Sequence, residues 1–205
     1  MAQAPPGLGR RLHSISGVVP VGAFLAFHLY ANLEARRGAD AYNAMARRFH
    51  EIPLLVAIEI LLIAAPLVYH GIYGLFLVAN EPPAAGRPGA GRRALSVAQR
   101  VTGGVLFAFV LFHLWTARLV QLRDHDSLDL FRLMQAVLAS PWLRAAYAAG
   151  ILAATFHLSA GLWTFAETWG LAPTPGRRRL AAAVSVLAFV ALSAMGLSAL
   201  SAFRL

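Results

Sequence analysis

Four histidines lie inside long apolar stretches of this chain: His28, His70, His113 and His157. An imidazole removed from water costs free energy unless it finds a partner. Four such residues therefore need a shared explanation. Imidazole nitrogen is the commonest metal ligand and titrates near neutral pH, so metal binding and proton transfer are the two chemistries that these residues favour.

The sequences around the histidines divide them into two pairs. His28 and His113 occur in the shared pattern Phe-x-x-Phe-His-Leu-aromatic. His70 and His157 occur in the shared pattern His-x-x-x-Gly-Leu-aromatic. The glycine of the second pattern is one helical turn from its histidine and on the same face, where its missing side chain would leave room for a flat macrocycle.

Five apolar segments must position these histidines. Each is about 20 residues or longer, which suits a hydrocarbon core of about 30 Å at about 1.5 Å rise per residue. The predicted segments are 12–33, 53–79, 96–119, 141–169 and 180–203. The chain is 59% hydrophobic and 13% charged, whereas soluble domains carry about 25% charged residues. We therefore predict an all-α membrane protein, a single domain over residues 1–205.

The positions of the histidines predict two layers within the bundle. Consecutive segments run in opposite directions, and each of the first four carries its histidine roughly two-thirds of the way along. His28 and His113 therefore share one depth and His70 and His157 another, with the layers about 10–15 Å apart. The matching motifs indicate a duplicated two-helix unit followed by a fifth helix without a histidine.

Two facing imidazoles can hold one haem iron, which then has no open coordination position and favours electron transfer. The chain has no cysteine, which excludes iron–sulfur clusters and c-type haem attachment and leaves b-type haem. The pattern predicts two haems b. Two alternatives stay open: neutral histidines hydrogen-bonded between helices, and a haem-free bundle that translocates protons or solutes.

Charge bears on the surroundings and the orientation of the bundle. The net charge of +9 comes from arginine alone. Because these arginines lie between apolar segments, they favour a membrane surface or an acidic partner rather than nucleic acid. The side that holds the N-terminus concentrates its arginines near the segment ends, which predicts a cytoplasmic N-terminus. Two connections, 41–52 and 128–138, have helical periodicity and predict helices that lie on the membrane surface or in solvent.

Three motifs resemble one family of membrane proteins. Arg10-Arg-Leu-His-Ser-Ile-Ser-Gly-Val-Val-Pro-Val-Gly22, Gln99-Arg-Val-Thr-Gly103 and Gly161-Leu-Trp-Thr-Phe165 are similar to the cytochrome b membrane anchor of succinate:quinone oxidoreductases and quinol:fumarate reductases. The five-helix, two-haem type is the most similar, and the resemblance covers nearly the whole chain.

The resemblance implies a division of labour between subunits. Flavoprotein and iron–sulfur subunits would oxidise succinate on the cytoplasmic side of a prokaryotic membrane, and no residue of this chain would act on succinate. This chain would pass electrons through the two haems to quinone, with menaquinone a better guess than ubiquinone. His70 and His157 would bind the haem proximal to the iron–sulfur subunit, and His28 and His113 the distal haem. Operation as a quinol:fumarate reductase stays open, as does a higher oligomer of the complex.

Further residues are candidates for quinone and propionate binding. Glu59 is the only carboxylate well inside a segment, about 16 Å from the layer of His70 toward the distal layer. The family has a glutamate in the matching segment, which implies proton exchange at a distal quinone site; a protonated, hydrogen-bonded glutamate is the alternative. The inner-face residues Arg11, His13, Ser14 and Arg100 suit anionic haem propionates, with ordinary interfacial anchoring as the alternative.

Overall fold

The computed structural model describes residues 7–81, 89–119 and 129–204, and these residues form helices and turns with no strand. Five helices are long and apolar enough to cross a membrane. These are span I (Leu8–Arg37), span II (Leu55–Asn80), span III (Ala90–Ala117), span IV (Pro141–Thr168) and span V (Pro175–Ala202). The predicted all-α membrane bundle is confirmed.

Several spans are built from more than one element. Span I consists of α1 (Leu8–Ser16), η1 (Gly17–Val21), α2 (Gly22–Asn32) and η2 (Leu33–Arg37), and span II of α4 (Leu55–Ile58), η3 (Glu59–Ala64) and α5 (Ala65–Asn80). Span III lies in α6 (Ala90–His113) and η4 (Leu114–Leu119). Spans IV and V are α9 (Pro141–Thr168) and α10 (Pro175–Ala202).

Three spans begin earlier than predicted, at Leu8, Ala90 and Pro175 rather than at residues 12, 96 and 180. The added turns contain arginines, which lower the local hydropathy. Arginine is nevertheless a good helix former, and its long side chain can carry the charge away from the apolar region. Hydropathy therefore places the first residue of these helices too late in the sequence.

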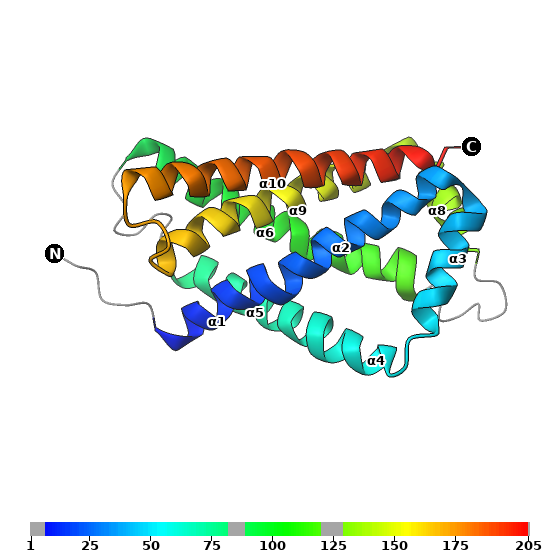
Figure 1. The fold of residues 1–205 in the computed structure, drawn as a ribbon, viewed down its shortest axis with the longest axis horizontal. Helices are drawn as coiled ribbons and strands as arrows, with labels where there is room; N and C mark the ends of the chain where they lie inside the picture. Colours follow the sequence, from blue (N-terminus) through cyan, green and yellow to red (C-terminus); the bar gives the residue numbers. More distant parts are fainter. Residues whose placement is uncertain (1–6, 82–88, 120–128, 205) are drawn as a thin grey trace.

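The spans form a closed order around the bundle (Figure 1). Helix α9 packs against both α6 and α10, α10 also packs against α2, and α1 packs against α5. Helix α5 contacts α6 and so connects the two halves of the repeat. Span V thus touches both span IV and span I, while spans II and III leave most of their apolar surface for lipid.

Short π-helical segments interrupt spans I and II at prolines. Pro20 lies within η1, and Pro66 follows directly after η3 in the first turn of α5. Proline lacks an amide hydrogen and its ring displaces the preceding turn, so the regular hydrogen-bond ladder cannot continue through it. The two π segments contact each other, so the irregular turns of spans I and II lie side by side.

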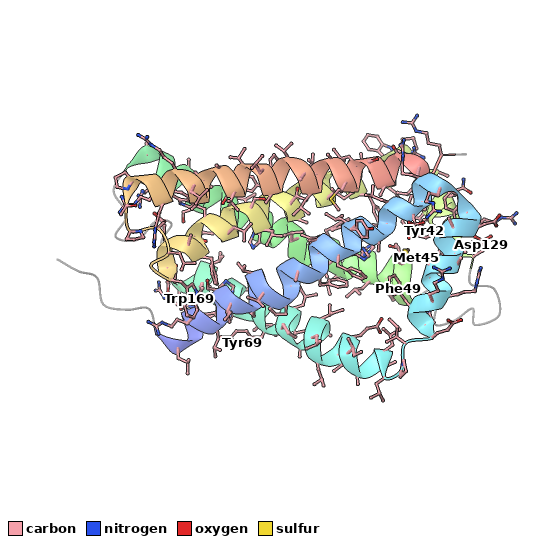
Figure 2. The ribbon with its side chains drawn as sticks, in the orientation of Figure 1. Tyr42, Met45, Phe49, Tyr69, Asp129 and Trp169 are labelled. Carbon is pink, nitrogen blue, oxygen red and sulfur yellow. The ribbon has the colours of Figure 1, made fainter. Side chains whose placement is uncertain are left out.

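Two shorter helices close one end of the bundle. Helices α3 (Ala39–His50) and α8 (Leu130–Leu138) contact each other at the end opposite the start of α1 (Figure 1). They cover a buried cluster formed by Ala35, Tyr42, Phe131, Leu138, Tyr147 and Phe203. Figure 2 shows Tyr42 and Asp129 at this end and Tyr69 and Trp169 at the other. We call this closed end the outer cap.

Candidate metal centres

The structure brings the four span histidines together as the two expected pairs. His28 of α2 and His113 of α6 have ring centroids 5.8 Å apart, with the ring planes at 72°. His70 of α5 and His157 of α9 have ring centroids 6.1 Å apart, at 88°. Antiparallel packing of neighbouring spans produces this result, because it places histidines of alternate spans at the same depth.

Backbone carbonyl groups determine which nitrogen of His70 and His157 carries the proton. His70 Nδ1 lies 3.0 Å from the carbonyl oxygen of His13, and His157 Nδ1 lies 3.1 Å from that of Gln99. A carbonyl oxygen can only accept a hydrogen bond, so Nδ1 must be the donor in both rings. Each Nε2 therefore keeps its lone pair, which is the arrangement of a metal ligand oriented by a second partner.

A chain of hydroxyl groups leads to the same assignment for His113. Thr116 Oγ1 donates to the carbonyl oxygen of Phe112 at 3.0 Å, so it accepts from the hydroxyl of Tyr147 at 2.8 Å. The oxygen of Tyr147 is then the acceptor for His113 Nδ1 at 3.4 Å. Nε2 of His113 is again the nitrogen with the free lone pair.

His28 is connected to the outer cap through the side chain of Asn32. Asn32 Nδ2 donates to the carbonyl oxygen of His28 at 2.8 Å and lies 3.4 Å from His28 Nε2. Because an amide NH₂ can only donate, Nε2 is the acceptor there. The hydroxyl of Tyr42 on α3 donates to Asn32 Oδ1 at 2.9 Å. Burial raises the pKa of Tyr42 to about 12, with nearby Tyr147 as a second cause, so this hydroxyl stays protonated as a donor.

Both pairs have the dimensions of a two-ligand metal site. Two imidazole–metal bonds of about 2 Å each require ring centroids about 6 Å apart, and the observed separations are 5.8 and 6.1 Å. Among the described residues, no group of three or more His, Cys, Asp or Glu could hold a metal ion. Two imidazoles paired in an apolar bundle suit a metal whose remaining ligands come from a macrocycle, as in haem.

The glycines of the motifs that contain His70 and His157 face protein side chains. A Cβ on Gly74 would lie 3.2 Å from the ring of His13, and one on Gly161 would lie 3.7 Å from the amide of Gln99. The space that the sequence assigned to a macrocycle is thus shared with these two side chains. Both side chains carry a buried polar atom without a hydrogen-bond partner, His13 Nδ1 and Gln99 Oε1. Such atoms suit a layer that also receives a cofactor with polar groups.

The four propionate candidates have different surroundings. The ring of His13 stacks on that of His70, with centroids 4.1 Å apart and planes at 5°. Arg11 is exposed and lies over the ring of Trp169, 5.7 Å from its centroid, and Ser14 is half-buried in α1. His13 thus contacts a paired histidine, and the propionate role of all four stays a prediction.

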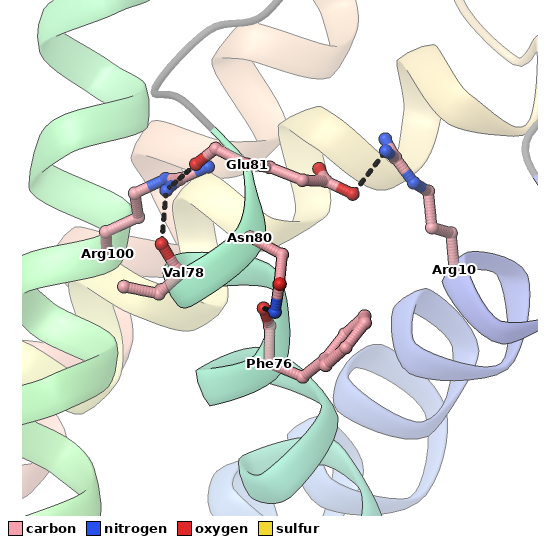
Figure 3. Close-up of polar contacts among 6 residues, drawn as sticks. All are labelled: Arg10, Phe76, Val78, Asn80, Glu81 and Arg100. Carbon is pink, nitrogen blue, oxygen red and sulfur yellow. Dashed lines mark hydrogen bonds and ion pairs between the residues drawn. The ribbon is translucent and has the colours of Figure 1, made fainter.

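Arg100, about three turns into α6, contacts the end of span II (Figure 3). Its Nη1 donates to the carbonyl oxygens of Glu81 at 2.5 Å and Val78 at 3.3 Å. The carboxylate of Glu81 in turn pairs with Arg10 of α1. Glu81 therefore links the ends of spans I, II and III.

Glu59 faces the protein rather than lipid. It is half-buried at the start of η3, in register with half-buried Leu55 and Ile63. The neighbouring apolar residues Ile58 and Ile60 are 40% and 54% exposed. The one carboxylate of span II is therefore on the narrow stripe that contacts the rest of the bundle.

Several contacts of the histidines could not be anticipated from residue types. The carbonyl groups of His13 and Gln99 have no signature of their own, and Asn32 and Tyr147 occur in segments without a motif. Aligning His13-Ser-Ile-Ser-Gly17 with Gln99-Arg-Val-Thr-Gly103 would have indicated the first two, because both segments occupy the same place in the internal repeat.

Comparison with known proteins points to one family. Residues 92–195 match the family described as succinate dehydrogenase/fumarate reductase transmembrane subunit. The chain is similar to the succinate dehydrogenase cytochrome b558 subunit of Bacillus subtilis (strain 168), with 42% identity over 195 residues. The aligned region covers 95% of each chain.

Proposed function

Because the chain belongs to the family of transmembrane cytochrome b subunits of succinate dehydrogenases and fumarate reductases, we propose that it carries electrons between an iron–sulfur subunit and a membrane quinone. It is an integral membrane subunit of such a complex. The observation that supports the electron-transfer role is the presence of two imidazole pairs, each about 6 Å between centroids. Nε2 of His70, His113 and His157 keeps its lone pair, and that of His28 accepts from the amide of Asn32.

We assign the pairs as the residues that would bind two haems b. His70 and His157 would hold the proximal haem, and His28 and His113 would hold the distal haem. When bound, a haem iron with two imidazole ligands exchanges single electrons and leaves no open position for oxygen. The protein orients each ring through its Nδ1 or its neighbouring amide and excludes water by packing four apolar spans around the pairs.

The proximal end is the docking side in this proposal. It carries the start of α1 and the arginines that begin spans III and V, among them Arg92 and Arg177. A basic surface close to the proximal pair suits acidic partner surfaces and the cytoplasmic leaflet. Flavoprotein and iron–sulfur subunits would bind here and perform all succinate chemistry, with this N-terminus in the cytoplasm.

Glu59 is the residue that we assign to proton exchange with quinone. It lies in the half of span II that leads to the outer cap, and its side chain faces the bundle. A carboxylate in the membrane interior is costly and suits a proton-transfer role. Menaquinone is the better candidate substrate, in keeping with the two-haem type.

Reduced-minus-oxidised absorbance of the purified complex tests the proposal. Two b-type haems per chain are expected, with one lost in His70→Ala and the other in His28→Ala. His50→Ala is the matched control, because His50 is an exposed histidine of α3 and its removal should leave both haems. A haem-free wild-type chain with pH-gradient-dependent flux would instead support a translocating bundle.

A further inference from the structure

The two halves of the repeat surround the two proximal histidines with equivalent groups. Spans I and II form the first half, and spans III and IV form the second. In the first half, His13, Ser16 and Gly17 of span I surround His70 of span II. In the second half, three residues of span III surround His157 of span IV: Gln99, Thr102 and Gly103. We call these the first and second positioning sites.

Each positioning site contains a backbone carbonyl and a hydroxyl group. In the first, the hydroxyl of Ser16 donates to the same His13 carbonyl oxygen that accepts from His70, at 3.0 Å. In the second, Thr102 Oγ1 shares its hydrogen between the carbonyl oxygens of Ala98 at 2.8 Å and Gln99 at 3.1 Å, and it lies 3.3 Å from His157 Nδ1. In both sites a hydroxyl group thus donates to the backbone carbonyl oxygen that accepts from Nδ1 of the histidine ring.

Each positioning site also contains a glycine that the ring covers. A Cβ on Gly17 would lie 2.3 Å from Cε1 of His70, and a Cβ on Gly103 would lie 3.1 Å from Cε1 of His157. The next residue, Gly104, has nothing within 4 Å of its Cβ position. A side chain would therefore crowd the imidazole at Gly103 but would have room at Gly104.

The second site adds a further contact that the first lacks. Gln99 Nε2 donates to the backbone carbonyl oxygen of His157 at 3.0 Å. The backbone carbonyl oxygen of Gln99 accepts from Nδ1 of the His157 ring. The backbone and the side chain of His157 are thus both bound to one residue. In the first site, the ring of His13 stacks on His70 instead.

We propose that these two sites are a duplicated device that fixes the tautomer and the ring plane of the proximal ligands, with Ser16, Gly17, Thr102 and Gly103 as positioning residues. The inference rests on the proposed haem-ligand role of His70 and His157. Because each ring is held by its own helix pair, the two planes are set independently. The two ring planes are near-perpendicular, at 88°.

Glycine substitutions in the intact complex test the device. Gly17→Ala forces the His70 ring to move, and we expect the haem content to fall from two to one with the distal signal retained. Gly103→Ala is milder, and we expect both haems to remain while the proximal low-spin electron paramagnetic resonance signal and midpoint potential shift. Gly104→Ala is the matched control and should match the wild type. The proximal signal is the one that His70→Ala removes.

A second pair of variants keeps the test decisive if Gly17→Ala fails to fold. Thr102→Val keeps the shape but removes the hydroxyl, so the proximal midpoint potential should shift, and Thr102→Ser should restore it. Wild-type proximal spectra and potentials in both Gly103→Ala and Thr102→Val would overturn the inference while leaving the haem assignment intact. Absence of haem from the wild type would overturn the proposed function itself.

Discussion

At the residue scale, the four histidines differ in what holds them. His70 and His157 each donate from Nδ1 to a carbonyl that cannot reverse its role. His113 depends on two hydroxyls, and His28 on an amide whose partner is Tyr42 in the outer cap. Nδ1 of His70 and His157 is therefore hydrogen-bonded to the backbone, whereas His28 and His113 are held by side chains.

Glu59 gives a prediction at this scale. Glu59→Gln keeps the size of the side chain but cannot exchange a proton, so we expect quinone-linked turnover to fall by about 10²–10⁴-fold. Haem content and spectra should stay normal, because Glu59 is not one of the proposed ligands and lies about 16 Å along span II from His70. Succinate-linked turnover with a soluble quinone measures the effect, and Glu51→Gln, at an exposed turn before span II, is the control. Full turnover in Glu59→Gln would show that Glu59 does not exchange protons with quinone.

At the element scale, the outer cap depends on one junction between α3 and α8. Asp129 precedes α8, where its carboxylate accepts from the amide of Arg132 at 3.0 Å and from Asn43 of α3 at 2.9 Å. Asn43 Oδ1 also accepts from the amide of Phe131 at 3.2 Å. Two side chains thus provide the helix N-cap and connect the two cap helices.

Replacing Asp129 should destabilise the outer cap. Asp129→Ala should cost about 1 kcal/mol of stability at neutral pH, measured by thermal unfolding in detergent, whereas Asp129→Asn should retain most of the cap. Hydrogen bonds from the Arg132 amide and Asn43 lower the pKa of Asp129 in the folded chain. Its stabilisation is therefore complete above the ordinary value of about 3.9 and is lost as the pH falls through the lower folded value. A constant difference between wild type and Asp129→Ala across that range would contradict this account.

The elements also show what could be predicted from sequence. The five spans follow from apolar length, and the pairing of the histidines follows from their depth and shared motifs. The early starts at Leu8 and Ala90 were missed because arginines mask helical turns in a hydropathy profile. The contacts of His70 and His157 were missed because a carbonyl group is present at every residue. The ligand roles, the propionate contacts and Glu59 remain predictions.

At the scale of the whole molecule, span V joins the two halves of the repeat without supplying a histidine. It packs on α9 and α2, and small residues permit the close approach, including a buried hydrogen bond between Thr155 and Ser193 at 2.8 Å. Gly196 is the tightest point, because a Cβ there would lie 2.6 Å from Ile151 and 3.1 Å from Leu29.

Substituting Gly196 should weaken the bundle without altering its metal centres. Gly196→Ala should cost about 1–3 kcal/mol through overpacking and lower the midpoint of thermal unfolding. The haem content of the folded fraction should not change, because span V carries no ligand. Gly176→Ala, in the first turn of the same helix with nothing near its Cβ position, should behave as the wild type. Loss of haem from folded Gly196→Ala would show that span V shapes the centres directly.

The outer cap has a consequence for how the substrate reaches the distal pair. Tyr42, Phe131, Tyr147 and Phe203 fill the end of the bundle beneath α3 and α8, so the short route from the aqueous phase is blocked by packed aromatic rings. Under the proposed function, a quinone would arrive sideways from the lipid, and the concentration that governs its encounter would be its mole fraction in the bilayer. We expect the apparent Michaelis constant to scale with the amount of lipid or detergent in the assay, as surface dilution requires, rather than with the volume of buffer.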